Sequence, residues 1–447
     1  MSDKSYLQAL QEAAFWSEYH RKRRDNPHGV TAEQVGAGSG GGEEIENRLL
    51  AVEAHTSDTE NPHAVTAEQI GAAEAAALLA HIADTSNPHS VTAEQIGVTG
   101  GGGASSLLQY HPIWYSADST KIPGLGSGDG KWYGGVLGPD GKIYGIPGMS
   151  ESVLIIDPVA KTADTTTITG LTGGSKWCGG VLGPDGKIYG IPDMSESVLI
   201  IDPVAKTADT TTITGLTGGS KWCGGVLGPD GKIYGIPDMS ESVLIIDPVA
   251  KTADTTTITG LTGYAKWYGG VLGPDGRIYG IPSMSESVLI IDPVAKTADT
   301  TTITGLTGYA KWYGGVLGPD GRIYGIPSMS ESVLIIDPVA KTADTTTITG
   351  LTGYAKWYGG VLGPDGRIYG IPSMSESVLI IDPVAKTADT TTITGLGGET
   401  SKWGGGVLGH DGRIYGIPTS SESVLILSGG MPTMPIEPLL SPYLNKF

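Results

Sequence analysis

The chain has 447 residues, with 47 acidic and 28 basic side chains and a formal net charge of −19. A chain this acidic is a poor partner for nucleic acid and for anionic membrane surfaces. It holds 70 glycines, 28 prolines and two cysteines, so a disulfide framework is excluded, and the spacing of the glycines decides between a low-complexity chain and a repeat fold.

The N-terminal residues carry no secretory signal, because they contain no apolar core of the required length. The longest apolar runs, such as residues 153–156, are too short to cross a bilayer. We therefore expect a protein made in the cytoplasm without a signal peptide, and no membrane insertion.

Residues 20–98 contain one short module three times. Its Asn-Pro-His-X-Val-Thr-Ala-Glu-Gln sequence stands at 26–34, 61–69 and 87–95. Each threonine is a predicted helix N-cap with glutamine three residues later. Short helices are predicted around the modules, at 6–24, 43–55 and 72–83. Helices of this length are marginal alone in water, so we expect their apolar faces to pair with another copy of the chain.

The modules resemble those in the proximal parts of bacteriophage tail fibres and related receptor-binding virion proteins. The resemblance implies that residues 1–36 form an N-terminal helix and first attachment module, and that residues 37–98 attach and oligomerise the chain, with a trimer favoured. It also implies a location in the virion, with a tail or baseplate protein as the partner of the N-terminus and a distal domain facing the host. The first copy departs from the pattern, because Arg23 stands where the others have Asp58 and Asp84.

A basic run next to two aromatic residues is the candidate attachment surface. The residues of this attachment surface are Phe15, Trp16, Arg21, Arg23 and Arg24. The alternative is that these positive charges are solvated and oppose the dipole at a helix C-terminus.

Histidines of the modules are the candidate metal ligands. On a trimer axis, His28, His63 and His89 would each meet two symmetry mates, which suits a transition metal. The alternative, which we favour, is that each histidine closes the Asn-Pro turn and bonds a backbone carbonyl. No metal or other cofactor is therefore predicted.

A different repeat follows a glycine-rich linker at 99–110. Tryptophan recurs every 45 residues from Trp132 to Trp357, and once more at Trp403 after one inserted residue. The repeated sequence predicts four strands in a unit. In the first unit they are residues 132–137, 142–146, 152–156 and 162–168, and a turn at Asp140-Gly141 joins the first two. Four-stranded units of this length are typical of a β-propeller.

The ends of the repeat region predict how the ring closes. The seventh unit stops at Leu427 and lacks a fourth strand, whereas residues 116–125 align with residues 162–171, the fourth strand of the first unit. The N-terminal strand is therefore expected to complete the last blade, which leaves no long unpaired edge. The predicted fold is mainly β, a seven-bladed propeller over 111–427 preceded by short α-helical oligomerising modules. The paired glycines and Asp-Gly turns make the units similar to kelch repeats, and that resemblance implies a fold only.

We expect no catalysis. No phosphate loop, zinc-protease helix or nucleophile elbow is present, and only His111 and His410 of the propeller could act as histidine bases. Carboxylates recur in nearly every unit, which is typical of turns rather than of a general acid.

The tryptophans, methionines and cysteines of the repeats are expected to have structural roles. The tryptophans and methionines are expected to pack between blades. Cys178 and Cys223 occupy one repeat position on neighbouring blades. Their Cα atoms are expected to lie more than about 7 Å apart, so free thiols are predicted.

Differences between the near-identical units predict the binding surface. They concentrate before the tryptophan and after the second strand, two connections that lie at the same end of an antiparallel blade. We call this end the variable face, and the end with the Pro-Asp-Gly turns the opposite face. The candidate ligand-binding residues are Tyr264, Tyr309, Tyr354, Asp193, Asp238, Ser283, Ser328 and Ser373. Aromatic and polar groups of this kind suit a carbohydrate or a protein loop, and neutral drift in loops is the alternative.

Residues 428–447 leave the repeat and end in apolar residues, which predicts a docking tail. The expected function is a phage fibre or adhesin whose propeller binds a host-surface glycan or protein. The alternatives are a structural virion decoration or spacer and, less expected, an enzyme that depolymerises glycans.

Overall fold

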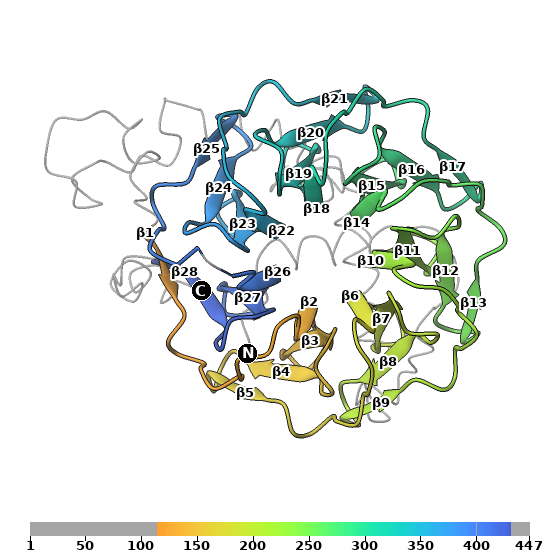
Figure 1. The fold of residues 1–447 in the computed structure, drawn as a ribbon, viewed down its shortest axis with the longest axis horizontal. Coiled ribbons are helices and arrows are strands. Elements are labelled where there is room, and N and C mark those ends of the chain that lie inside the picture. The colour runs from red at the N-terminus through yellow and green to blue at the C-terminus, as the bar shows by residue number, and fades with distance from the viewer. Residues whose placement is uncertain (1–113, 399, 431–447) are drawn as a thin grey trace, which may run out of the picture. The chain divides into compact units, whose positions relative to one another are not determined.

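A computed structural model describes residues 114–398 and 400–430. These residues form seven four-stranded antiparallel sheets arranged around a central axis, so the seven-bladed propeller predicted from the repeat is confirmed (Figure 1). The predicted helical modules, the linker at 99–110 and most of the C-terminal tail lie outside the described residues. Among those described, no helix is long and apolar enough to cross a membrane.

Each blade runs from an innermost to an outermost strand. The innermost strands are β2 (Trp132–Leu137), β6 (Trp177–Leu182), β10 (Trp222–Leu227), β14 (Trp267–Leu272), β18 (Trp312–Leu317), β22 (Trp357–Leu362) and β26 (Trp403–Leu408). The second strands are β3 (Ile143–Pro147), β7 (Ile188–Pro192), β11 (Ile233–Pro237), β15 (Ile278–Pro282), β19 (Ile323–Pro327), β23 (Ile368–Pro372) and β27 (Ile414–Pro418). The third strands are β4 (Leu154–Asp157), β8 (Leu199–Asp202), β12 (Leu244–Asp247), β16 (Leu289–Asp292), β20 (Leu334–Asp337), β24 (Leu379–Asp382) and β28 (Leu425–Gly430). The outermost strands are β5 (Thr162–Asp164), β9 (Thr207–Asp209), β13 (Thr252–Asp254), β17 (Thr297–Asp299), β21 (Thr342–Asp344), β25 (Thr387–Asp389) and β1 (Trp114–Asp118).

Two local predictions need correction. The first turn is centred one residue earlier than expected, on Pro139-Asp140, with Gly141 donating to the carbonyl of Gly138 at 3.1 Å. Gly141 has φ 78°, a conformation that favours glycine. The outermost strand ends at Asp164 rather than at residue 168, because the Asp164 carboxylate accepts the backbone N–H of Thr166 at 2.7 Å and turns the chain.

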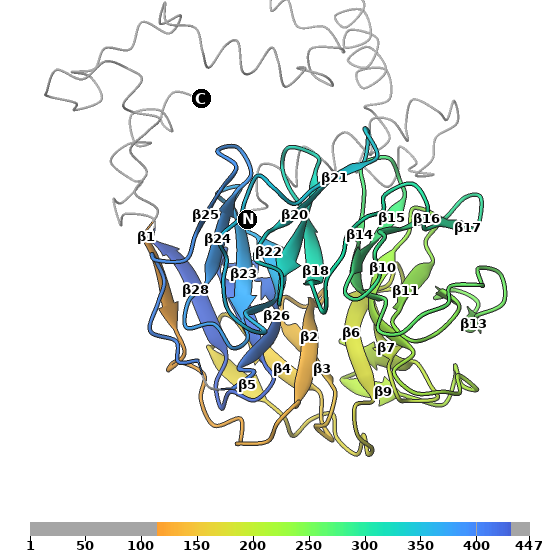
Figure 2. The same ribbon diagram turned by 45° about the horizontal axis from the view of Figure 1, so that its top comes forward.

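The ring closes as the sequence predicts. β1 pairs antiparallel with β28, and Ala117 lies opposite Leu427. Figure 2 shows β1 at the start of the described chain beside β28 at its end. β28 continues three residues past Leu427, because β1 offers pairing partners as far as Gly430. The N-terminal strand therefore completes the seventh blade.

Neighbouring blades are held together by the tryptophan of the innermost strand. Trp177 is 3% exposed and packs with Tyr144 and Ile146 of the preceding blade. Its indole N–H donates to the carbonyl of Ser197 at 2.8 Å, so the one polar atom of the buried ring has a partner. The tryptophan half of the packing prediction is confirmed.

A second contact joins blades on the opposite face. The Tyr144 hydroxyl donates to Asp140 at 2.9 Å, and Lys206 of the next blade forms an ion pair with Asp140 at 2.6 Å. Burial and the hydrogen bond to Asp140 raise the pKa of Tyr144. The same three-residue arrangement recurs at the next four junctions, so the repeated aspartates of the Pro-Asp-Gly turns have a structural role there.

Paired glycines allow the innermost strands to approach the axis closely. Gly224 has φ +77°, and a Cβ atom placed on it would lie 2.8 Å from the Cα atom of Gly269 on the next blade. The second glycine of the pair makes room for the preceding blade, since a Cβ on Gly225 would lie 2.7 Å from Ile191. The glycine content of the chain therefore shapes a narrow axis whose wall is backbone.

Replacing Gly224 with alanine is expected to destabilise the propeller by several kcal/mol, because the Cβ would meet backbone that cannot easily move. Gly231→Ala is the matched control: Gly231 has φ +76° with no atom within 4 Å of an added Cβ, so only the backbone strain of about 1–2 kcal/mol remains. Chemical denaturation measures both variants. Equal losses would show that the close approach to Gly269 does not limit this site.

Candidate ligand-binding face

The connections predicted to form the variable face do lie together. The backbone N–H of Gly148, after the second strand, donates to the carbonyl of Lys131, before the innermost strand, at 2.9 Å. Met149 in the same way donates to Gly130 at 2.9 Å. The prediction that the differing positions gather on one end of the ring is confirmed.

The exposed aromatic side chains of this face are the three predicted tyrosines. Tyr264, Tyr309 and Tyr354 are 66%, 65% and 67% exposed. Each precedes an alanine in the left-handed region, with φ of 43–45°, so the chain turns directly after the ring. The backbone N–H of Ala355 donates to the sulfur of Met329 at 3.5 Å, which holds this turn against the preceding blade.

The predicted serines lie deeper than the tyrosines. Ser283, Ser328 and Ser373 are 1–2% exposed. A hydrogen bond joins the side chain of Ser283 to that of Tyr313 on the next blade. These serines therefore support the wall of the axis and do not present a surface themselves.

The methionine prediction is wrong for the first three repeats. Met149 and Met194 are 50% and 49% exposed, and Met239 is 36% exposed. They lie on the variable face, because the sulfur of Met149 is 3.4 Å from a Cβ placed on Gly174. Tyr264 occupies in its repeat the position of Gly174.

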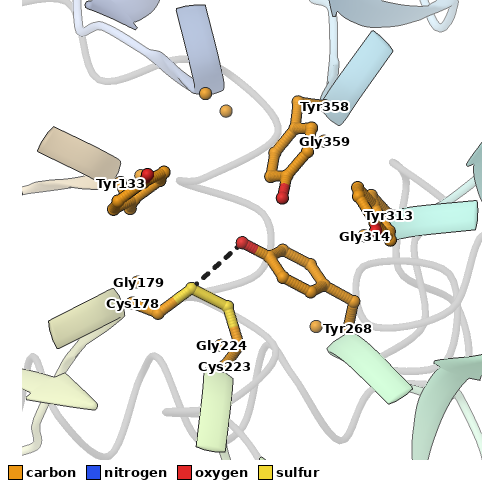
Figure 3. Close-up of a pocket in the computed structure, with 14 residues that line it drawn as sticks. Tyr133, Cys178, Gly179, Cys223, Gly224, Tyr268, Tyr313, Gly314, Tyr358 and Gly359 are labelled. Atoms are coloured by element: carbon orange, nitrogen blue, oxygen red, sulfur yellow. Dashed lines mark hydrogen bonds between the residues drawn. A yellow bond between two sulfur atoms is a disulfide. The ribbon is translucent and has the colours of Figure 1, made fainter. Parts of the chain in front are cut away.

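Tyrosine and cysteine side chains from the start of the innermost strands point into the axis (Figure 3). Tyr268 stacks on Tyr313 with ring centroids 4.5 Å apart, and both meet Tyr358 edge to face at 5.2 and 4.6 Å. Together with Tyr133, Cys178 and Cys223, the rings line a cavity of about 110 Å³. Burial raises the pKa values of Tyr268 and Tyr358, so the cavity wall is neutral and largely apolar.

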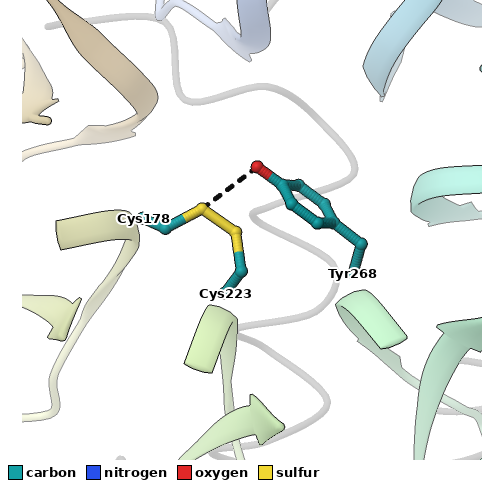
Figure 4. Close-up of a disulfide and its surroundings, with 3 residues drawn as sticks. All are labelled: Cys178, Cys223 and Tyr268. Atoms are coloured by element: carbon teal, nitrogen blue, oxygen red, sulfur yellow. Dashed lines mark hydrogen bonds between the residues drawn. A yellow bond between two sulfur atoms is a disulfide. The ribbon is translucent and has the colours of Figure 1, made fainter. Parts of the chain in front are cut away.

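The prediction of free thiols is wrong. Cys178 and Cys223 form a disulfide, and their Cα atoms are 4.9 Å apart (Figure 4). The innermost strands approach this closely because a glycine follows each cysteine: a Cβ on Gly179 would lie 3.2 Å from the Cα of Gly224. The hydroxyl of Tyr268 donates to the sulfur of Cys178 at 3.1 Å.

Two half-buried carboxylates stand on the same two blades as the disulfide. Burial is the main cause that raises the pKa of Asp193 to about 6, against the opposing effects of Lys221 and Ser220. Burial also raises the pKa of Asp238 to about 6, and the neighbouring charge of Asp193 adds to the shift. Blades are numbered along the chain from the one that begins with β2. Blades 2 and 3, which begin with β6 and β10, thus form an acidic sector, whereas blades 4, 5 and 6, which begin with β14, β18 and β22, carry the exposed tyrosines.

Replacing Asp193 and Asp238 together with asparagine is expected to raise the thermal stability at pH 7.5, by on the order of 1 kcal/mol per group after allowance for solvent. A raised folded-state pKa gives stability that is complete below the unfolded value near pH 4 and is lost as the pH rises through about 6. At pH 4 the variant and the native chain should therefore melt alike. A gain of equal size at both pH values would contradict this assignment.

Buried lysines, which sequence reasoning missed, hold the variable face together. Lys311 is 2% exposed, and its Nζ donates to the carbonyls of Ser283, Ser285 and Gly308 at 2.7, 3.0 and 3.2 Å. Burial lowers the pKa of Lys311 to about 8. The signal was available, because a lysine precedes the tryptophan in all seven repeats.

The remaining candidates fall elsewhere. The attachment residues Phe15, Trp16, Arg21, Arg23 and Arg24, the histidines His28, His63 and His89, and His111 all lie outside the described residues. His410 is exposed on the opposite face, in the turn that replaces Pro-Asp-Gly by His-Asp-Gly. Over 114–398 and 400–430, no group of three or more potential metal ligands comes together.

Comparisons with known proteins identify the fold. No protein-family model and no characterised protein sequence matches the chain. Virginiamycin B lyase from Staphylococcus aureus is similar in structure, with a TM-score of 0.57 and 13% identity over 70% of this chain and 99% of that chain. Hydrazine synthase from Kuenenia stuttgartiensis has a TM-score of 0.52 and 18% identity over 67% of this chain and 95% of that chain. The extracellular domain of a one-component system from B. thetaiotaomicron has a TM-score of 0.52 and 10% identity over 72% of this chain and 43% of that chain.

The expectation of no catalysis is overturned by these comparisons. Virginiamycin B lyase is an enzyme with a similar architecture, so the fold does not argue against an active site. Identities this low carry no reaction from one protein to another. The chain contains a seven-bladed β-propeller of a fold that serves both enzymes and extracellular domains.

Proposed function

We propose that the chain is a virion adhesin of a bacteriophage, whose propeller binds a host-surface glycan or protein through the variable face. The observation that carries this proposal is the placing of Tyr264, Tyr309 and Tyr354, each about two-thirds exposed, on that face. Exposed rings on a rigid scaffold provide contact area with little loss of conformational entropy.

The geometry of the ring supports recognition by this face rather than through the channel. The Tyr268 cluster and the disulfide narrow the axis, and the cavity of about 110 Å³ there is smaller than a typical ligand site. The buried lysines fix the connections that carry the tyrosines. The face is therefore preorganised, which reduces the entropic cost of binding.

The virion part of the proposal rests on the modules at residues 20–98. Their resemblance to tail-fibre modules supports attachment to a tail or baseplate protein, self-association as a trimer, and a location in the virion after synthesis in the host cytoplasm. A structural decoration or spacer is the other function that this resemblance would allow. It differs in having no host ligand, so an adsorption experiment separates the two.

The test is competition for adsorption by the phage that encodes the chain. Host cells are first incubated with the purified full chain, and free phage are then counted. The native chain should reduce adsorption in a saturable manner, and the variant with all three tyrosines changed to alanine should not. No reduction by the native chain would refute host recognition and favour a decoration. Because lyases share this fold, the same incubation is analysed for released oligosaccharide.

A further inference from the structure

We propose that Tyr264, Tyr309 and Tyr354 form three similar sites, each of which binds one neutral pyranose ring of a repeating glycan. This inference rests on the proposed function, since it requires that the variable face binds the host surface. It adds the ligand class, the number of sites and the selection against acidic sugars.

The three sites are similar because the same Gly-Tyr-Ala sequence and the same backbone recur at the entries to blades 4, 5 and 6, although the preceding blade places Asp238 next to the first connection and Ser283 and Ser328 next to the other two. Each tyrosine follows a glycine with φ of 120–124° and precedes an alanine with φ of 43–45°. The three exposed fractions agree to within two percentage points. A ring face that is open to solvent at each position can stack on the C–H face of a pyranose.

A groove next to this position supplies polar groups. At the entry to blade 2 it has a volume of about 250 Å³ and is lined by Gly174 together with Ser195, Ser197 and Thr210. The hydroxyl residues recur at the entry to blade 4 as Ser285, Ser287 and Thr300, where Tyr264 replaces the glycine. Tyr264 thus takes the position at which Gly174 lines the groove of blade 2, and the hydroxyl groups of such a lining can bond sugar hydroxyls.

The charges around the tyrosines favour a neutral ligand. Glu286 and Glu331 are exposed on the connections between the second and third strands, which lie on the same face. The nearest lysines are not available to an acidic sugar, because Lys311 and Lys356 are 2% and 3% exposed with Nζ bonded to backbone carbonyls. With a net charge of −19 for the chain, a glycan rich in carboxylate or phosphate would be repelled.

Three weak sites on one rigid ring suit a polymer. Stacking one sugar on one exposed ring gives little affinity, but simultaneous contacts along a repeating glycan raise the apparent affinity by orders of magnitude. Blades 2 and 3 have Gly174 and Gly219 at the position of the tyrosine. These two blades therefore lack the aromatic ring and are not expected to bind a sugar there.

The test begins with a glycan array that holds neutral and acidic members, probed with the full chain. Binding is expected for neutral glycans, for example a galactan, and not for the matched galacturonan. Titration calorimetry with a trisaccharide of the bound class should then give three sites per chain. Each single Tyr→Ala variant should remove one site, and the triple variant should bind no sugar. The avidity for the polymer should fall by about tenfold or more for each site that is lost.

A gain-of-site variant keeps the test independent of lost folding. Gly174→Tyr with Ser175→Ala copies the sequence of blade 4, and Gly174 has ordinary van der Waals room for a Cβ next to Met149. This variant should bind four sugars per chain. Binding of one sugar that none of the tyrosine variants changes would overturn the three-site inference, and the adsorption experiment would then decide on the proposed function separately.

Two further outcomes separate the two proposals. Preference for acidic glycans, or adhesion to cells without binding to any glycan, would overturn the three-site inference alone. If the native chain binds no sugar and does not adhere to cells, the proposed function is refuted as well.

Discussion

Truncation of the chain so that it begins at Gly126 is expected to lower the free energy of unfolding more than any single substitution on the variable face does. Such a chain lacks β1, which closes the ring by pairing with β28, and it lacks Ile122 and Leu125, which are 2% and 9% exposed. Removing these two side chains alone costs about 3–6 kcal/mol. The midpoint of thermal unfolding should fall by on the order of 10 °C.

A chain that begins at Pro112 is the control for this truncation. Residues 112–447 form one of the two compact units into which the chain divides, so the propeller transition should keep its midpoint. The unpaired edge of β28 should also make the Gly126 chain associate, which sedimentation would detect. An unchanged midpoint for the Gly126 chain would show that the ring does not depend on the N-terminal strand.

Reduction of the Cys178–Cys223 disulfide is the second change expected to have a large effect. The disulfide joins innermost strands of neighbouring blades and has a sequence separation of 45 residues. Closing a loop of that length restricts the unfolded chain by about 4 kcal/mol. Reductant should therefore lower the midpoint of thermal unfolding by on the order of 10 °C.

Two variants control for other effects of the reductant. The Cys178→Ser, Cys223→Ser chain should melt at the lower temperature with or without reductant. Replacing both cysteines with tyrosine, the residue at this position in four other blades, shows how much packing of the cavity can compensate. If thiol titration confirms reduction and the native chain still melts at its original temperature, the disulfide does not stabilise the ring.

The fold could be predicted from the sequence because the repeat specifies it several times over. Seven near-identical units fixed the number of blades, and the alignment of residues 116–125 with 162–171 fixed the closure. Errors were local. The hairpin turn was placed one residue late because Pro139, Asp140 and Gly141 are all turn formers, and only the backbone hydrogen bond decides among them.

The site was less predictable, because burial depends on how tightly the blades converge. The disulfide was missed since the distance between innermost strands depends on glycines whose close approach becomes visible only in three dimensions, such as Gly179 and Gly224. The same sequence position places Ser283 beneath the surface and Asp193 at it. Gathering of the variable connections on one face was predictable, because strand direction alone determines it.

Saturation binding of the labelled full chain to host cells tests directly whether the variable face recognises the host. Changing Tyr264, Tyr309 and Tyr354 to alanine should weaken the apparent affinity at least about tenfold without changing the midpoint of thermal unfolding. The control changes Val204, Val249 and Val294 to alanine on the opposite face, where they are 83–84% exposed, and should bind as the native chain does. Equal binding by the tyrosine variant, or loss of binding in the valine variant, would contradict the assignment of recognition to the variable face.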